Sequence, residues 1–115
     1  ELMKQYVGAF RDWMAANGYA DKPLAVTEFG ILLPQDYGFP PELVRQYMID
    51  AFDYFRTATG PYGLAADGGR LTQYAFWYSL YDDGDYPTGN LFDAPRGALT
   101  PLGTAFIDYI ERLAP

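Results

Sequence analysis

Glu28 is the residue whose type and position most directly suggest chemistry in this sequence. It follows the nearly apolar run 24–27 and stands two residues before Gly30. An unpaired carboxylate is costly to desolvate, so a glutamate at the end of a buried strand should be paired, hydrogen-bonded or functional. Solvent or a helix dipole accounts for the other glutamates, which lie at the terminus or in helical patterns: Glu1, Glu42 and Glu111. Glu28 is therefore the candidate catalytic carboxylate, and a structural pair with an arginine is the alternative.

The aromatic segment 71–80 supplies a second candidate, Trp77. Side chains of a strand alternate between its faces, so Trp77 shares a face with Ala75 and Ser79. An indole can serve as a platform for the apolar face of a sugar ring while the hydroxyls are hydrogen-bonded around it. Ordinary core packing is the alternative for a large aromatic residue at a strand end.

The composition narrows the chemistry. The sequence contains no cysteine and no histidine, which excludes disulfides, thiol nucleophiles, a Ser-His-Asp triad and the usual zinc sites. The net charge is −7 with only 8 lysines and arginines, which argues against nucleic acid or an anionic membrane as partner. No apolar run approaches the ~20 residues that cross a bilayer, and the first residues lack the pattern of a signal peptide. Any chemistry must rest on carboxylates, tyrosine, hydroxyls or backbone groups.

Hydrophobic periodicity predicts a single α/β unit, residues 1–115, in the order helix, strand, helix, strand, helix. Strands separated by a full helix pair in parallel through a right-handed crossover. The predicted elements have these bounds: helix 2–17, strand 24–29, helix 41–59, strand 71–80, loop 82–99 and helix 100–113. Two parallel strands leave both sheet edges uncovered, so we expect further strands from upstream sequence or from another chain.

Local features are also expected within these elements. The strand 24–29 should be covered on both faces, as parallel strands of α/β folds are. Gly18 should end the first helix in a left-handed conformation, and Thr100 with Pro101 should begin the last one. One buried apolar stripe is expected on the first helix: Met3, Tyr6, Val7, Phe10, Trp13 and Met14.

Three segments, taken together, resemble a known group of enzymes. Residues 22–30, KPLAVTEFG, are similar to the seventh strand of clan A glycoside hydrolases, a barrel group that includes families 5 and 39, in which TEFG or TEYG holds the nucleophile. Residues 76–80, FWYSL, resemble the eighth strand, whose tryptophan floors the subsite of the attacked sugar. Residues 89–93 and 99–103 resemble the closing segment that leads into the eighth helix. The order and spacing of the segments carry the resemblance, which spans most of the chain.

The resemblance implies the C-terminal portion of a TIM (β/α)8 barrel, made of helix 6, strand 7, helix 7, strand 8 and helix 8. It implies a retaining enzyme that hydrolyses O-glycosidic bonds in poly- or oligosaccharides, with Glu28 as nucleophile and Trp77 as sugar platform. The acid/base of such enzymes is a glutamate in an Asn-Glu pair after the fourth strand, and this chain contains no such pair. Two carboxyl groups need no metal or cofactor for this reaction. The substrate class leads us to expect a secreted protein.

The loops that follow the two strands supply further candidates. Substrate contacts are expected there because barrel enzymes bind substrates at the carboxyl ends of their strands. The candidates are Asp36, Tyr37, Tyr86 and Asn90. The run Asp82-Asp83-Gly84-Asp85 suggests calcium, but it lacks the spacing of an EF-hand, so a solvated acidic loop is favoured.

Two other functions fit the same residues. One is a carbohydrate-binding or pseudoenzyme segment that keeps the aromatic floor without the chemistry. The other is a small α/β domain that associates with itself through its strand edges and holds Glu28 in an ion pair.

Overall fold

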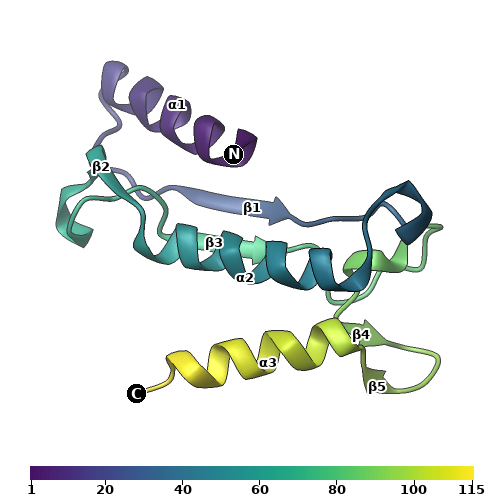
Figure 1. The fold of residues 1–115 in the computed structure, drawn as a ribbon. Coiled ribbons are helices and arrows are strands. Elements are labelled where there is room, and N and C mark those ends of the chain that lie inside the picture. Colours follow the sequence, from purple (N-terminus) through teal and green to yellow (C-terminus); the bar gives the residue numbers. More distant parts are fainter. The chain divides into compact units, whose positions relative to one another are not determined.

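A computed structural model describes all residues, 1–115, and has an α/β architecture. Its helices lie close to the predicted positions: α1 (Leu2–Ala16), α2 (Pro41–Thr57) and α3 (Pro101–Leu113). Its strands are short: β1 (Ala25–Phe29), β2 (Thr59–Leu64), β3 (Tyr74–Trp77), β4 (Phe92–Asp93) and β5 (Ala98–Leu99) (Figure 1). Short 3-10 turns join them: η1 (Gln35–Tyr37), η2 (Ala65–Asp67) and η3 (Pro87–Gly89).

The chain forms two compact units, each drawn from two stretches of sequence. The first contains residues 1–27 and 52–76, and the second contains residues 28–51 and 77–115. β1, α2 and β3 each contribute residues to both units. Because the units alternate along the chain, neither is a separate sequential domain, and the prediction of a single domain stays a prediction.

β1 and β3 are neighbours in one sheet and run in the same direction (Figure 1). Near the start of the strands, the amides of Gln73 and Tyr74 donate to the carbonyl of Leu24. Near their end, the amide of Tyr78 donates to the carbonyl of Phe29 at 2.8 Å. Partners that advance together along both strands define parallel pairing, as the sequence predicted.

The predicted coverage of β1 on both faces is wrong for this structure. Thr27 and Glu28 are exposed, whereas Phe29 is buried. β1 has only one neighbouring strand, β3, and in the second unit the aromatic ring of Tyr47 on α2 lies against Trp77 of that strand. Tyr74 and Phe76 of β3 are exposed as well.

α1 ends as the sequence predicts. Asn17 is the C-cap residue and Gly18 has a φ angle of 82°. The amide of Tyr19 donates to the carbonyl of Met14 at 2.7 Å, and the amide of Gly18 donates to Ala15 at 3.3 Å. These two bonds make a Schellman motif, in which glycine accepts the left-handed conformation without a Cβ clash.

The buried stripe of α1 differs from the predicted one. Three residues of this helix are buried: Val7, Arg11 and Met14. The predicted aromatic members lie on the surface, where Phe10 stacks on Trp13 at 5.3 Å between ring centroids. The predicted stripe consists of apolar and aromatic residues and does not contain Arg11, a residue type that is usually exposed.

Arg11 joins three parts of the first unit through its guanidinium. Arg11 is only 1% exposed. Nε donates to the carbonyl of Leu71 at 2.6 Å, Nη1 to the carbonyl of Lys22 at 3.0 Å, and Nη2 to Oε1 of Gln73 at 2.5 Å. Gln73 in turn accepts from the amide of Leu24 at 2.8 Å. These hydrogen bonds connect α1 to the segments that lead into β1 and β3.

α2 ends two residues earlier than expected, and the segment after it is a strand. Residues 59–64 form β2, and Arg70 bridges back to Thr59 and Leu64. The turn between them uses Gly68 with a φ angle of 63°. A left-handed φ suits glycine because it has no Cβ, so the Gly-rich connection makes a tight hairpin-like return.

α3 begins at the predicted cap. The Thr100 hydroxyl accepts from the amide of Gly103 at 3.0 Å, and Pro101 occupies the first turn. The preceding segment is more ordered than the predicted loop 82–99, because β4 and β5 pair antiparallel with Phe92 opposite Leu99. Gly97, with a φ angle of 63°, makes the turn between them.

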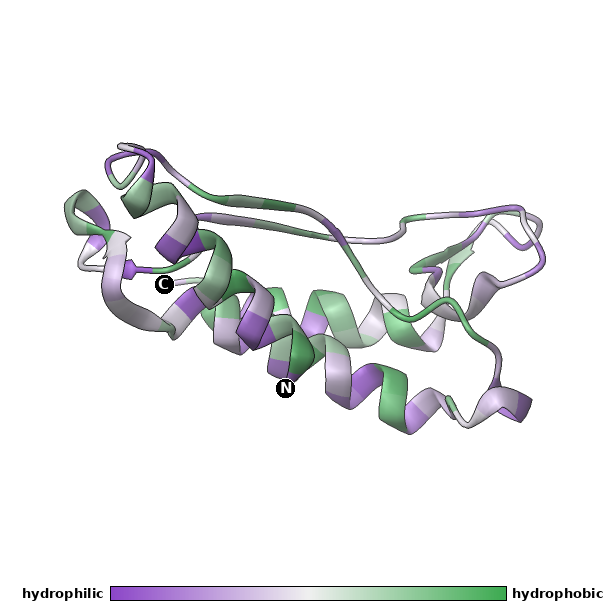
Figure 2. Cartoon of the chain, turned by 90° about the horizontal axis from the view of Figure 1, so that it is seen from above, coloured by the Kyte–Doolittle hydropathy of each residue, from purple (hydrophilic) through white to green (hydrophobic).

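Hydrophilic and hydrophobic residues alternate along the helices (Figure 2). The buried residues of α2 recur at helical spacing: Val44, Met48, Ala51 and Phe55. No helix in the structure is both long enough and apolar enough to cross a membrane.

Candidate functional site

Glu28 lies at the carboxyl end of β1, in the second unit. Its side chain is exposed, and no ion pair or hydrogen bond engages its carboxylate. The alternative of a structural pair with an arginine therefore finds no partner within this chain. An exposed and unpaired carboxylate at a strand end is accessible to a ligand.

Gly30 allows the backbone beyond Glu28 to approach the neighbouring strand. A Cβ atom added at Gly30 would lie 2.5 Å from the carbonyl oxygen of Tyr78. Such a distance is a steric clash, so a side chain at this position would push the two strand ends apart. The glycine that follows Glu28 and Phe29 thus brings Glu28 close to the residues after β3.

Trp77 packs among aromatic residues of the second unit. Its ring meets Phe29 edge to face at 5.4 Å between centroids, and it lies 6.2 Å from the ring of Tyr47. Its Nε1 donates to the carbonyl of Gly89 at 2.7 Å. The indole ring is therefore packed against two aromatic rings. Its hydrogen bond to Gly89 connects the loop after β3 to the strand.

The structure brings Glu28 together with Tyr78 and not with Trp77. Because Phe29 and Trp77 are in ring contact, they lie on the same face of the paired strands. Side chains alternate along a strand, so the preceding Glu28 lies on the other face. Tyr78, the residue directly after β3, continues the ladder through its amide bond to the carbonyl of Phe29 and lies on that face as well. In agreement, the charge of Glu28 is among the smaller causes that raise the pKa of Tyr78, after its hydrogen bond to Asp82, the charge of Asp82 and burial.

Tyr78 is joined to Asp82 by a short hydrogen bond. The phenol of Tyr78 donates to Oδ2 of Asp82 at 2.5 Å. This bond and the charge of Asp82 are the largest causes that raise the pKa of Tyr78, followed by burial and the charges of Glu28 and Asp83. The same bond, together with one from the amide of Gly84, lowers the pKa of Asp82 against an opposing effect of burial. Both shifts keep the pair as a neutral phenol and an ionised carboxylate near neutral pH.

Asn90 holds the main chain of Asp82 in place. Its Oδ1 accepts from the amide of Asp82, and its Nδ2 donates to the carbonyl of the same residue, each at 2.9 Å. Asn90 is 7% exposed. The predicted role of Asn90 was substrate contact, but both atoms of its amide group are bonded within the loop.

The remaining predicted contacts lie on the surface of the same unit. Tyr37 belongs to η1 and is 66% exposed, and Asp36 precedes it in that turn. Tyr86 caps η3 and is also exposed. No hydrogen bond or ring contact joins either tyrosine to Glu28, so their role in binding stays a prediction.

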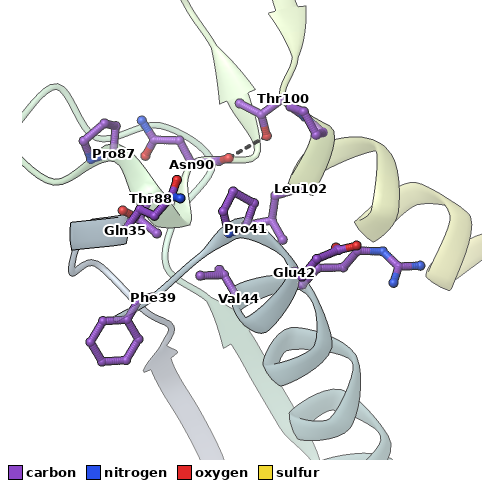
Figure 3. A pocket seen from close by; sticks show the side chains of 12 residues that line it. Gln35, Phe39, Pro41, Glu42, Val44, Pro87, Thr88, Asn90, Thr100 and Leu102 are labelled. Carbon is purple, nitrogen blue, oxygen red and sulfur yellow. Dashed lines mark hydrogen bonds between the residues drawn. The ribbon is translucent and has the colours of Figure 1, made fainter. Parts of the chain in front are cut away.

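A cavity of about 290 Å³ lies where the loops after β1 and β3 meet the first turns of α2 and α3 (Figure 3). The side chains of Pro41, Val44 and Leu102 give it apolar walls, and Asn90 and Thr100 lie beside it with their mutual hydrogen bond (Figure 3). Neither Glu28 nor Tyr78 lines this cavity. This cavity is therefore separate from the candidate carboxylate.

No group of carboxylates or other ligating side chains in the structure is arranged to hold a metal ion. In the acidic run 82–85, the carboxylate of Asp82 accepts hydrogen bonds from the phenol of Tyr78 and from the amide of Gly84. These two hydrogen bonds link parts of the loop to each other and use both oxygens of the Asp82 carboxylate.

Sequence reasoning missed the pair of Tyr78 and Asp82. A signal was available, because Tyr78 falls on the face opposite Trp77 and an acidic residue follows it four positions later. Only the register between β1 and β3 reveals which of the two aromatic residues shares a face with Glu28.

Comparisons with known proteins assign no family to the chain. No family model matches it, and no curated protein and no solved structure matches it either.

Proposed function

We propose that this chain is the C-terminal portion of a retaining glycoside hydrolase barrel and that Glu28 is its nucleophile. One observation carries the proposal: an unpaired, exposed carboxylate at the carboxyl end of a parallel strand, on the same face as the aromatic residue that directly follows the neighbouring strand. Barrel enzymes place their catalytic groups at this end of their strands. The resemblance of residues 22–30 and 76–80 to clan A enzymes supports the same function.

The proposed reaction has two steps. The carboxylate of Glu28 attacks the anomeric carbon and forms a glycosyl ester, while a second carboxylic acid protonates the departing oxygen. The second group then acts as a base and activates water, which releases the sugar and restores Glu28. No metal or cofactor takes part.

The second carboxyl group is proposed to come from upstream strands of the full-length protein. A retaining pair stands about 5–5.5 Å apart across the scissile bond. Within this unit, the carboxylate of Asp82 is engaged by Tyr78 and Gly84, and a low pKa disfavours the protonated form that an acid requires. Asp82 is therefore a poor candidate for the acid/base.

The aromatic surface for the sugar is proposed to include Tyr78. Tyr78 shares the face of Glu28, whereas the ring of Trp77 packs on Phe29 and Tyr47. Trp77 keeps a proposed part in the site, because its bond to Gly89 fixes the loop that borders Tyr78. A polysaccharide or oligosaccharide substrate leads us to propose a secreted protein.

The barrel itself is proposed from the uncovered side of β3. Tyr74 and Phe76, which alternate with the residues facing α2, are 57% and 55% exposed. In a closed barrel such side chains point inward and are packed by layers of residues from the other strands. Upstream strands would thus bury the side chains that this chain leaves open.

Rescue by an external nucleophile tests the proposal. In the full-length protein, Glu28→Ala should lose hydrolysis of aryl glycosides, because no group remains to attack the anomeric carbon. Added azide, a small anion that fits the space of the lost carboxylate, should restore release of the aryl group and give a glycosyl azide of inverted configuration. Glu111→Ala, which removes an exposed carboxylate from α3, should behave as the wild type with or without azide. Hydrolysis by Glu28→Ala at the wild-type rate would contradict the proposal.

A further inference from the structure

We propose that Asp82 is a positioning residue that holds the Tyr78 ring beside Glu28. The inference rests on the proposed function, in which Glu28 attacks the sugar and Tyr78 faces it. It assigns to Asp82 neither contact with substrate nor proton transfer.

The hydroxyl of Tyr78 can donate a single hydrogen bond, and Oδ2 of Asp82 accepts it at 2.5 Å. Without this acceptor, the phenol would be free to donate to Glu28, which lies on the same face at the strand end where the amide of Tyr78 bonds the carbonyl of Phe29 at 2.8 Å. A hydrogen bond donated to Glu28 would stabilise the ionised carboxylate and weaken it as a nucleophile. Asp82 thus keeps the Tyr78 ring in one orientation and prevents its hydroxyl from donating a hydrogen bond to Glu28.

Both the carboxylate and the main chain of Asp82 are fixed by hydrogen bonds. Its Oδ1 accepts from the amide of Gly84 at 2.7 Å, which fixes the carboxylate group. Its amide and carbonyl are both bonded to the side chain of Asn90, at 2.9 Å each. An acceptor with a fixed main chain and a fixed carboxylate can impose a geometry on its donor.

The anchoring continues to a helix. The hydroxyl of Thr100 donates to the carbonyl of Asn90 at 2.7 Å and accepts from the amide of Gly103 at the start of α3. A continuous set of hydrogen bonds therefore runs from the first turn of α3 through Thr100, Asn90 and Asp82 to Tyr78. Sites supported by packed secondary structure are held more tightly than sites on free loops.

A double-mutant cycle in the full-length protein tests the role of Asp82. If Asp82 acts only through the phenol of Tyr78, Asp82→Ala and Tyr78→Phe remove the same interaction. Each should lower kcat/KM for an aryl glycoside by about tenfold, the effect of losing one hydrogen bond to a charged group. The double variant should also lose about tenfold, and not about a hundredfold, because coupled residues are not additive.

Two further variants keep the test independent of folding. Asp82→Asn keeps one acceptor oxygen, which can serve the phenol but not the amide of Gly84 as well, and should lose less kcat/KM than Asp82→Ala. Asp85→Ala removes a neighbouring exposed carboxylate and should leave kcat/KM unchanged. Urea unfolding of each variant shows whether the loss arises from the folded enzyme.

The outcomes separate this inference from the proposed function. An active wild type, an inactive Glu28→Ala variant and non-additive losses would support both. An active wild type with additive losses, or with Asp82→Asn as impaired as Asp82→Ala, would overturn the role of Asp82 and leave the nucleophile intact. A wild type without glycosidase activity would overturn both.

Discussion

Glu28→Gln is expected to lower kcat/KM of the full-length protein for aryl glycosides by about 10³-fold or more, since a residue essential to the chemical step is lost. Glutamine keeps the size of the side chain but offers no negative charge for attack on the anomeric carbon. The carboxylate is exposed and unpaired, so its replacement should leave the free energy of unfolding nearly unchanged. Steady-state kinetics and urea unfolding of the same preparation measure both quantities.

Glu111→Gln is the matched control, because it neutralises another exposed glutamate of the same unit. Its kcat/KM should equal that of the wild type. Retained sugar binding with no hydrolysis in either wild type or Glu28→Gln would favour a non-catalytic carbohydrate-binding protein. Full activity of Glu28→Gln would remove Glu28 from the mechanism.

Arg11→Met is expected to cost about 3 kcal/mol of unfolding free energy, because it leaves several buried hydrogen-bond acceptors without donors. The carbonyls of Lys22 and Leu71 and the Oε1 atom of Gln73 would lose their guanidinium donors. Methionine fills a similar volume, so the cost reports hydrogen bonding more than packing. Urea unfolding of the full-length protein measures it.

Arg45→Met provides the comparison, since Arg45 is exposed on α2 and forms no ion pair. Its change in unfolding free energy should stay within about 0.5 kcal/mol. Arg11→Lys should fall between the two, because one ammonium cannot reproduce a planar fork of donors. A cost for Arg11→Met as small as that for Arg45→Met would show that the network does not stabilise the fold.

The helices were predictable because their signals are local. Gly18 marks the end of α1 through a conformation that other residues resist, and Thr100 with Pro101 marks the start of α3. The apolar spacing of α2 matches its buried residues in the structure. In each case the determining residues lie within a few positions of the feature that they determine.

Features that depend on distant partners were not predictable. The burial of Arg11 requires acceptors about sixty residues further along the chain, at Leu71 and Gln73. The antiparallel pairing of β4 and β5 lies in a segment whose two-residue strands carry no periodic pattern. Hydrophobic periodicity and helix-capping residues are local signals and do not identify such distant partners.

The candidate site shows the same division. The chemistry of Glu28 could be inferred from its place after an apolar run, whereas its neighbour could not. The choice between Trp77 and Tyr78 depends on the register of β3 against β1, which the ring contact of Phe29 with Trp77 fixes. A shift of register by one residue would exchange the two faces, so the sequence alone could not show which of the two rings shares a face with Glu28.

Trapping the covalent intermediate tests the central claim most directly. The full-length protein would be incubated with a panel of 2-deoxy-2-fluoroglycosyl fluorides, in which the 2-fluorine slows both steps and the good leaving group lets the glycosyl ester accumulate. Mass spectrometry of the peptides should find one fluorosugar attached to Glu28, with loss of activity in proportion to labelling. A label on a different carboxylate of an active enzyme, or hydrolysis that inverts the anomeric configuration, would contradict the account.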